Sequence, residues 1–500
     1  MAMIPMKFNR AVTVALLAAT TVLTTHTLAQ AQELVLGVIG NSKDMVQPYS
    51  PTSSASAGSL YDQLYDSLTA YDSKGAVVME LAESMTPNAT MDVWTVKLRP
   101  NVERHDGKPF TADDVIASVK YMMDPANNFV VSSQIDFVDP TKLHKIDDLT
   151  IEFTLKRPFG LFANAFADND FRMRAIADDG SVVGTGPFKL ESFTPGQEAR
   201  LTRFEDYWGE KPGFDKLRII GFRDQQAVTN ALRGGQIDVA YSVPYTDVPA
   251  LTKDPKLKTV ISGTATYPML AVRVDTPPFN DSRVLEALKL VIDRQQIVDN
   301  AFGGYAKIAN DFLGNNTACP APAEPQRVQD IAKAKQLLAE AGKTNLKLEL
   351  VTDGAFAGMM EMAQLYAQQA AQAGIAIKVR RLDPASFLNR WREWPFLISL
   401  TSGPYETATL AALLPGQGEN ATHFDDAEYN DLAKKLQSTG DLTEQCKLIT
   451  QLQAIEYKRS GHIVAAYPEN ITVYRDTVSG LQPDLYGRTP IHYAGVTVSK

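Results

Sequence analysis

The chain has 500 residues, of which 44% are hydrophobic and 21% are charged, and its formal net charge is −9. These proportions are typical of a folded globular protein and exclude a chain that is disordered over most of its length. An acidic chain repels phosphate, so the net charge argues against nucleic acid as a partner. At this length we expect two or three lobes, each with its own core.

The first 31 residues have the pattern of an export signal. Lys7 and Arg10 form a short basic region, residues 11–23 are apolar, and the sequence AQA at 29–31 fits a cleavage site. A membrane anchor is the alternative, but a span needs roughly 20 apolar residues. We therefore predict a cleaved signal peptide over residues 1–31 and a periplasmic mature protein. The loss of Lys7 and Arg10 changes the net charge from −9 to −11.

Local signals are clear around residues 94–125. Residues 94–98 alternate as a strand, and Asp106 and Gly107 predict a turn. Thr111 is followed three positions later by Asp114, as in a helix capping box. The next residues form the apolar stripe of a helix that ends before Pro125: Val115, Val119, Met122 and Met123.

The second half of the chain predicts helices alternating with strands. A helix capped by Asp281 or Ser282 should bury one apolar face, made of Val284, Leu288, Val291 and Ile292. A helix is expected over 331–341, a strand over 346–350, a helix over 359–373 and a strand over 375–379, with Gly342 and Gly374 ending the two helices. A strand–helix–strand unit favours parallel pairing, so we expect an α/β lobe here.

Motifs for catalysis or metal binding are absent from the sequence. It contains no G-x-S-x-G, H-E-x-x-H or phosphate-loop pattern, and no two histidines are four positions apart. Adjacent carboxylates at 113–114, 147–148, 178–179 and 425–426 fit turns and helix caps better than a catalytic pair. Cys319 and Cys446 are either a disulfide or two free thiols, because sequence separation does not give their distance in space.

Several segments, in their order, resemble the extracellular solute-binding proteins of family 5, the oligopeptide, dipeptide and nickel-binding group of ABC importers. The segments are LYDSL at 64–68, WTVKLRP at 94–100, DGKPFTADDV at 106–115, GTGPFKL at 184–190, YWG at 207–209, ALRGGQID at 231–238, PPFNDSRV at 277–284, IDR at 292–294 and AKQLLAEAG at 334–342. The resemblance extends from about residue 33 to residue 485 and so covers nearly all of the expected mature chain.

The resemblance implies an α/β, two-lobed periplasmic binding protein fold of type II, peptide-binding-like, with an extra inserted α+β domain. Lobe one is expected over 32–75, 181–272 and 481–500, the inserted domain over 76–180, and lobe two over 273–480. It also implies a monomeric protein without enzymatic activity or cofactor. Such a protein captures a small molecule, for example a peptide or an opine, between its lobes and delivers it to an ABC transporter permease in the inner membrane.

Candidate ligand contacts near the N-terminal half are Ser53, Ser54, Tyr61 and Thr185. Relatives of this kind place cleft-facing groups just before the LYDSL segment, and hydroxyl groups there could bond a ligand backbone. A surface loop is the competing interpretation of Ser53 and Ser54, since small polar residues are common in loops. Thr185 lies between two glycines, so a structural turn is the favoured interpretation and ligand contact is secondary.

Further candidates lie in the predicted lobe two. Arg273 could hold a carboxylate or phosphate with two parallel hydrogen bonds, or it could pair with Asp275. Trp391, Trp394 and Tyr405 offer rigid contact area, with core packing as the alternative.

The segment GPYET at 403–407 departs from the Asp-rich stretch by which relatives bind an ammonium group. Glu406 could replace that aspartate, or the ligand could lack a free amino group, so an opine, a modified peptide or a sugar derivative stays open. A nickel chelate is less favoured, because no histidine cluster supports it. Two other functions compete with uptake: an exported hydrolase or peptidase, and a chemosensory or chaperone-like binding protein of the same fold.

Overall fold

The computed structural model describes residues 32–49, 54–127, 129, 131–168, 171–264, 266–314, 317, 319–417, 419–488 and 492–499. The predicted signal peptide and the candidate Ser53 therefore lie outside the described residues. Gln32–Lys500 forms one unit by its internal contacts. No described helix has both the length and the apolar composition that crossing a membrane requires.

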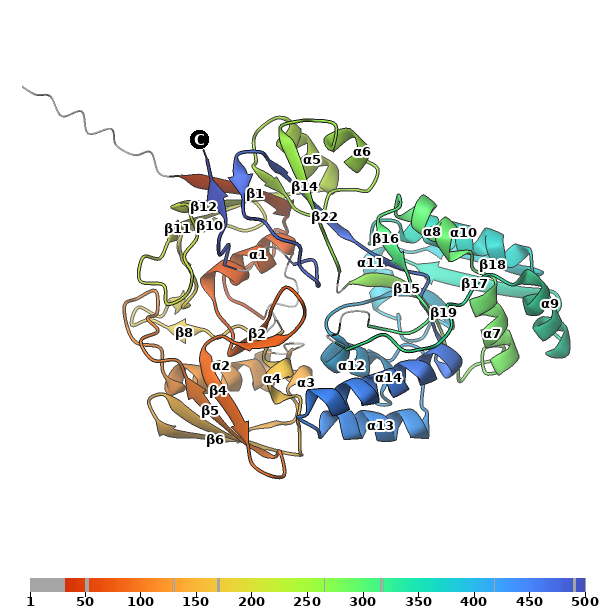
Figure 1. The fold of residues 1–500 in the computed structure, drawn as a ribbon, viewed down its shortest axis with the longest axis horizontal. Coiled ribbons are helices and arrows are strands. Elements are labelled where there is room, and N and C mark those ends of the chain that lie inside the picture. The colour runs from red at the N-terminus through yellow and green to blue at the C-terminus, as the bar shows by residue number, and fades with distance from the viewer. Residues whose placement is uncertain are drawn as a thin grey trace, which may run out of the picture. The chain divides into compact units, whose positions relative to one another are not determined.

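Seven strands form the largest sheet, in the order β10-β11-β12-β1-β13-β22-β14 (Figure 1). Their bounds are β10 Phe188–Thr194, β11 Glu198–Arg203, β12 Lys216–Phe222, β1 Glu33–Ile39, β13 Val239–Ala240, β22 Asn470–Arg475 and β14 Leu257–Ser262. Strand β1 pairs in parallel with β12 and β13. Helix α1 (Ala55–Leu64) packs with Leu34 and Leu36 of β1, whereas α5 (Gln225–Arg233) packs with Val35. The two helices thus cover opposite faces, as successive strand residues require.

A four-stranded antiparallel sheet has the order β4-β5-β7-β6. Its strands are β4 Ala82–Pro87, β5 Val93–Leu98, β7 Thr150–Leu155 and β6 Val138–Asp147. The predicted strand at 94–98 is confirmed, with Trp94, Val96 and Leu98 buried at alternate positions. The predicted capping box begins helix α2 (Ala112–Met123), which packs on β6. Three shorter helical segments follow α2: the 3-10 turn Pro125–Asn127, α3 Val131–Gln134 and α4 Phe162–Ala165.

The third sheet has five strands in the order β18-β17-β19-β15-β20. They are β18 Ile375–Arg381, β17 Leu346–Thr352, β19 Phe396–Thr401, β15 Tyr267–Val272 and β20 His462–Ile463. Strands β17 and β18 pair in parallel across helix α10 (Met359–Ala371), which confirms the predicted strand–helix–strand unit. Three further helices pack in the same core cluster as α10 and the five-stranded sheet: α7 (Ser282–Leu290), α8 (Arg294–Ala301) and α9 (Ile331–Glu340). Helix α11 spans Pro384–Leu388.

The remaining elements connect or extend these sheets. Helices α13 (Ala427–Gln437) and α14 (Leu442–Arg459) pack on each other, after a π-helical turn at Tyr405–Thr409 and helix α12 (Leu410–Leu413). Figure 1 shows α12, α13 and α14 gathered in blue below the five-stranded sheet. Helix α6 (Val248–Leu251) and four two-stranded pairs complete the fold: β2 Thr69–Tyr71 with β3 Val77–Met79, β8 Ala175–Ile176 with β9 Val182–Val183, β16 Ala306–Ile308 with β21 Ala466–Pro468, and β23 Val478–Ser479 with β24 Thr497–Val498.

Aspartates start many of the helices, which accounts for several acidic residues of the sequence. The residue before the helix accepts a backbone N–H of the first turn in six of them, namely Asp224, Asp281, Asp293, Asp330, Asp426 and Asp441. A side-chain oxygen there satisfies a backbone donor that has no partner within the helix. Asp114 and Asp426, each from an adjacent carboxylate pair, are therefore caps, as predicted.

The chain passes between the seven-stranded and the five-stranded sheet twice. One passage joins β14 to β15, and the other runs from β20 through β21 to β22. The expected lobe boundaries stay predictions, since strand pairing alone does not delimit folding units. Strand β15 pairs with β19 of the five-stranded sheet, and β22 pairs with β14 of the seven-stranded sheet. The sequence carries no strong linker signal at either point, because both passages are short and ordinary in composition.

Candidate functional site

A cavity of about 300 Å³ lies where two distant stretches of the chain meet. The residues of one wall lie between Gln134 and Phe171, in and around the four-stranded sheet. Those of the other wall lie between Met269 and Gln437. The walls also touch directly, since the Gly160 N–H donates to the carbonyl oxygen of Gln437 at 2.6 Å. This volume is at the small end of the range for pockets that bind small molecules.

Aromatic and aliphatic side chains form much of the lining. Phe137 and Phe159 stack with ring centroids 3.8 Å apart, and Phe171 lies on the same wall. Met269, Leu400, Leu410 and Leu414 line the opposite wall. Apolar lining of this kind binds the hydrocarbon parts of a ligand, while a few polar groups fix its orientation.

Glu406 is the buried charged group of the cavity. It lies in the π-helical turn after Gly403, whose φ of 94° favours glycine, and Pro404. The side chain is only 7% exposed, and its Oε1 accepts a hydrogen bond from the Thr317 hydroxyl at 2.6 Å. No ion pair among the described residues includes it. Burial raises the pKa of the Glu406 carboxyl, because the charged form loses hydration without gaining a cation.

Tyr405 points away from the cavity, into the core. It is fully buried, and its hydroxyl donates to Oε1 of Glu456 on α14 at 2.6 Å. Tyr429 donates to the same oxygen at 3.0 Å, and the Leu313 N–H donates to the other carboxylate oxygen at 2.7 Å. Burial raises the pKa of Glu456 to about 7. Tyr405 thus anchors the turn that carries Glu406, which corresponds to the core-packing alternative for this tyrosine.

A disulfide lies beside Thr317. Cys319 and Cys446 are bonded, with their Cα atoms 5.0 Å apart, which settles the question that the sequence left open. The bond ties the segment that carries Thr317 to helix α14. Helix α14 therefore constrains the Glu406 carboxylate in two ways: through Cys446, bonded to Cys319 near Thr317, and through Glu456, which holds Tyr405 of the same turn.

Three other candidates have structural partners and do not line this cavity. The Ser54 hydroxyl donates to Asp44 Oδ2 at 2.6 Å, and the Tyr61 hydroxyl donates to the carbonyl oxygen of Met45 at 2.9 Å. Thr185 is 1% exposed, and its hydroxyl donates to Asp66 Oδ2 at 2.5 Å. Their ligand roles stay predictions that the cavity does not support.

Arg273 and Trp391 line a second, more open cavity of about 730 Å³. Arg273 donates to both oxygens of Asp275, at 3.1 Å and 2.8 Å, so the ion pair given as the alternative is present. His423 Nδ1 lies 3.0 Å from Asp275 as well. A ligand carboxylate would have to compete with Asp275 for Arg273. Its ligand role also stays a prediction.

Trp394 is close in sequence to residues that line the second cavity, but it lines neither of the two cavities. It packs with a small cluster around Phe387 and Leu397, and the guanidinium groups of Arg380 and Arg390 lie 5.5 Å and 4.9 Å from its ring centre. Its contacts are those of a packed side chain covered by arginines.

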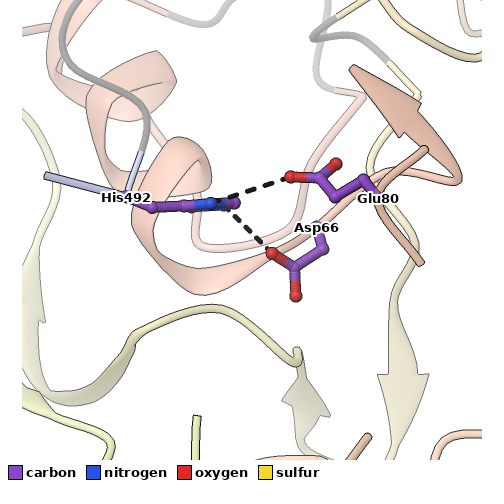
Figure 2. Close-up of side chains that lie close together, drawn as sticks. All are labelled: Asp66, Glu80 and His492. Carbon is purple, nitrogen blue, oxygen red and sulfur yellow. Dashed lines mark ion pairs between the residues drawn. The ribbon is translucent and has the colours of Figure 1, made fainter. Parts of the chain in front are cut away.

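Asp66, Glu80 and His492 form a buried cluster that sequence reasoning missed (Figure 2). His492 Nε2 lies 3.0 Å from Asp66 Oδ1, and His492 Nδ1 lies 3.7 Å from Glu80 Oε1. Figure 2 shows both carboxylates on the same side of the imidazole ring, with an ion pair drawn from the ring to each. Burial of the ring lowers the pKa of His492, but Asp66 and Glu80 together raise it above its usual value. Burial raises the pKa of Glu80 to about 7. Asp66 belongs to the LYDSL segment, and this motif is the sequence signal that could have drawn attention to the cluster.

The same cluster is poorly suited to hold a metal ion. The oxygens of Asp66 already accept hydrogen bonds from Thr185 at 2.5 Å, Trp208 at 3.1 Å and Tyr207 at 3.3 Å, besides the contact with His492. The two carboxylates also face different ring nitrogens, whereas a metal ion needs its ligands to converge on one point. We interpret the cluster as a buried ionic junction.

Known proteins are similar to this chain over nearly its whole length. The chain is 27% identical over 492 residues to the glutathione-binding protein GsiB of Escherichia coli (strain K12), covering 91% of this chain and 93% of that protein. Among solved structures, CtaP of Listeria monocytogenes, an ABC transporter substrate-binding protein, has a TM-score of 0.81 at 23% identity, covering 94% and 100% of the two chains. The oligopeptide-binding protein AppA of Bacillus subtilis, solved with a nonapeptide, has a TM-score of 0.76 at 21% identity, with coverage of 94% and 100%.

These likenesses show the two-lobed fold of peptide-binding type that the sequence predicted, and the resemblance is confirmed by a family model. Residues 76–416 match the model described as bacterial extracellular solute-binding proteins, family 5 middle. The motifs, the fold and this match agree, and the chain belongs to the bacterial extracellular solute-binding proteins of family 5.

Proposed function

We propose that the mature chain binds a small peptide-like solute in the Glu406 cavity and delivers it to the permease of an ABC importer from the periplasm. The proteins of this family bind solutes, and GsiB and AppA are named for glutathione and oligopeptides. We extend peptide-like binding to this chain, as a monomer that performs no reaction on its ligand. An exported hydrolase finds no support among the family or the similar structures.

One observation carries the proposal: a buried carboxylate without a counter-charge lines a cavity between two walls. Burial deprives the ionised Glu406 carboxylate of hydration free energy, and no described cation offsets this loss. An ammonium group of a ligand would offset it and would gain a charge-assisted hydrogen bond. Phe137 and Leu400, on opposite walls, can then cover the apolar part of the same ligand.

The arrangement of the chain suits capture by closure. Two short passages connect the seven-stranded and five-stranded sheets, and the cavity walls come from distant stretches of sequence. A ligand that contacts both walls binds the closed form better than an open one and therefore shifts the population toward closure. A permease that recognises the closed form would distinguish loaded from empty protein.

Calorimetry with short peptides tests the proposal, guided by native mass spectrometry of protein purified from its own host. We expect a di- or tripeptide to bind, and Glu406→Gln to weaken its binding by roughly tenfold to a hundredfold, the cost of one hydrogen bond to a charged group. Glu361→Gln is the matched control, since Glu361 is exposed on α10. Equal affinities of wild type and Glu406→Gln would reject this cavity as the site, and a hydrolysed peptide would reject the binding-only role.

A further inference from the structure

Tyr245 contacts the cores of both large sheets. It lies between β13 and α6, and its half-buried side chain packs against two core clusters, one around α5 and β13 and the other around α8 and α10. Tyr305, between α8 and β16, also packs against the cluster around α5 and β13. Side chains shared between two cores resist a movement of one sheet relative to the other.

The rings of these two tyrosines stack on each other. Their centroids lie 6.3 Å apart at an interplanar angle of 13°, and the buried Phe302 meets the Tyr245 ring edge-on at 5.9 Å. Gly303 and Gly304, with φ of 61° and 85°, turn the chain after α8 and bring Tyr305 to this position. Aromatic pairs in such arrangements stabilise a contact beyond the area that they bury.

The same two residues hold the backbone of the second passage between the sheets. Glu469 lies between β21 and β22, and its N–H donates to the carbonyl oxygen of Tyr305 at 2.9 Å. The Tyr245 hydroxyl donates to the carbonyl oxygen of Glu469 at 3.0 Å. Both backbone polar groups of this passage residue are therefore bonded to the tyrosine pair, so bending the chain at Glu469 disturbs at least one of these contacts.

A third cavity, of about 480 Å³, lies beside this contact. Its lining includes Thr266 of the first passage, Glu469 of the second, Tyr245 and Phe356. Protein interiors are otherwise close-packed, so a movement usually requires a core to unpack first. Free volume next to both passages removes that requirement, and the tyrosine contacts are left as the local resistance to bending.

The tyrosine pair is formed in a state of the protein whose cavity walls touch. The Gly160 N–H reaches the Gln437 carbonyl oxygen in the same structure. Separating these walls by bending the two passages would turn one sheet relative to the other, and Tyr245 and Tyr305 are attached to different sides of that movement. The stack and the closed walls are consequently expected to form and break together.

We propose that Tyr245 and Tyr305 form a clamp at the passages that stabilises the closed form before a solute binds, and that this clamp sets the affinity of the Glu406 cavity. The proposal rests on the solute-binding function proposed above and names a device that regulates it. The described lining of the Glu406 cavity includes neither tyrosine, so both are positioning residues. A solute that binds only the closed form binds in proportion to the closed fraction.

Distances between the two cavity walls test the clamp without any ligand. Spin labels on Lys142→Cys in β6 and Lys434→Cys in α13, both exposed positions, report the separation of the walls by double electron–electron resonance. We expect Tyr245→Leu to shift the population toward longer distances by about threefold to tenfold, the effect of losing an aromatic pair and a hydrogen bond. Tyr245→Phe keeps the stack and should shift it less.

Tyr474→Leu is the matched control, because Tyr474 is a half-buried tyrosine of β22 that packs with the core around α1 and β1. It should leave the distances as they are in the wild type. A normal melting temperature shows that each variant is folded. Unchanged distances in a folded Tyr245→Leu variant would overturn the clamp.

A double variant tests whether the two tyrosines act as a pair. Tyr305→Leu should shift the distances in the same direction as Tyr245→Leu, and the double variant should shift them by less than the sum of both, since either substitution already removes the stack. Fully additive shifts would reject the pair.

Calorimetry with alanyl-alanine then separates this inference from the proposed function. The affinity should fall in Tyr245→Leu by the same factor as the population of the closed form. A shift in distances with unchanged affinity would reject control of the Glu406 cavity by the clamp. If the wild type binds no short peptide while the distances still shift, the clamp stands and the proposed peptide-binding function fails.

Discussion

At the scale of single residues, the position of Glu406 depends on the tyrosine before it. Tyr405 is fully buried and donates to Glu456, which also accepts from Tyr429 and from the backbone of Leu313. A buried carboxylate needs several donors, because each lone pair left without a partner costs free energy. The Glu456 contacts therefore fix the turn from the core side, while the Thr317 hydroxyl donates a hydrogen bond to the Glu406 carboxylate.

We predict that Tyr405→Phe lowers the free energy of unfolding by about 1–3 kcal/mol, since it removes a donor from a buried carboxylate. It should also weaken solute binding several-fold, because the Glu406 turn loses its anchor. Urea unfolding and calorimetry measure the two effects. Tyr366→Phe is the control: Tyr366 is equally buried and donates at 3.1 Å to a backbone carbonyl, that of Leu288, on an element that does not line the cavity. If both variants lose affinity equally, Tyr405 has no special role in positioning.

At the scale of elements, helix α14 organises the site although it does not line the cavity. It carries Cys446, whose disulfide holds the segment of Thr317, and Glu456, which holds Tyr405. Its own start is fixed by Asp441, which accepts the N–H of Glu444 at 2.8 Å. One helix thus constrains two of the neighbours that surround Glu406.

We predict that the double variant Cys319→Ser, Cys446→Ser unfolds more easily by about 2–4 kcal/mol, because the cross-link closes a long loop in the unfolded chain. The cysteines are 127 positions apart. Guanidinium unfolding of the wild type with and without a reducing agent should reproduce the difference. The double variant should not respond to the reducing agent, and an unchanged midpoint in both experiments would contradict a stabilising cross-link.

At the scale of the whole molecule, the ionic junction joins segments that are far apart in the sequence. Asp66 follows α1, Glu80 precedes β4, and His492 comes from the last residues of the chain. Tyr207 also contacts His492 Nδ1 at 3.0 Å, and the buried Arg172 acts on both Glu80 and His492. Positive and negative groups alternate through this junction, so its stability depends on the protonation of each member.

We predict that the contribution of this junction to stability falls as the pH rises from about 5 to about 8. The pKa of His492 is raised above its usual 6.5, so its contribution is complete below that value and is lost as the pH rises through the folded pKa. Glu80, whose pKa is raised to about 7, acts in the same direction, since the folded state favours its neutral form. The pKa of Asp66 is lowered, so its contribution is lost only in acid below the usual 3.8.

His492→Gln should be less stable than the wild type near pH 5 by on the order of 1–3 kcal/mol, and the difference should shrink as the pH rises. Urea unfolding across this pH range measures it, with His144→Gln, an exposed histidine on β6, as the control. A difference that grows toward alkaline pH would show that the imidazolium does not stabilise the junction.

The sequence by itself determined the local elements and the fold class. Caps, turn glycines and apolar periodicity act within a few residues, so the helix begun by Thr111 and Asp114 and the unit of β17, α10 and β18 could be predicted. The ordered motifs placed the chain in its family. The departure at 403–407 pointed to Glu406 because the family resemblance implies an acidic ligand group at this place.

Only the tertiary structure decided which residues share a site. Phe137 and Glu406 line one cavity because two stretches more than 200 positions apart fold against each other, and no local pattern records such a meeting. The same holds for the disulfide, because the sequence does not show that Cys319 and Cys446 are within bonding distance. It also holds for the contacts of His492 with Asp66 and Glu80. Arg273 shows the converse: a charge that looked suited to a ligand lies beside Asp275 in another cavity, because the nearest opposite charge in space takes the bond.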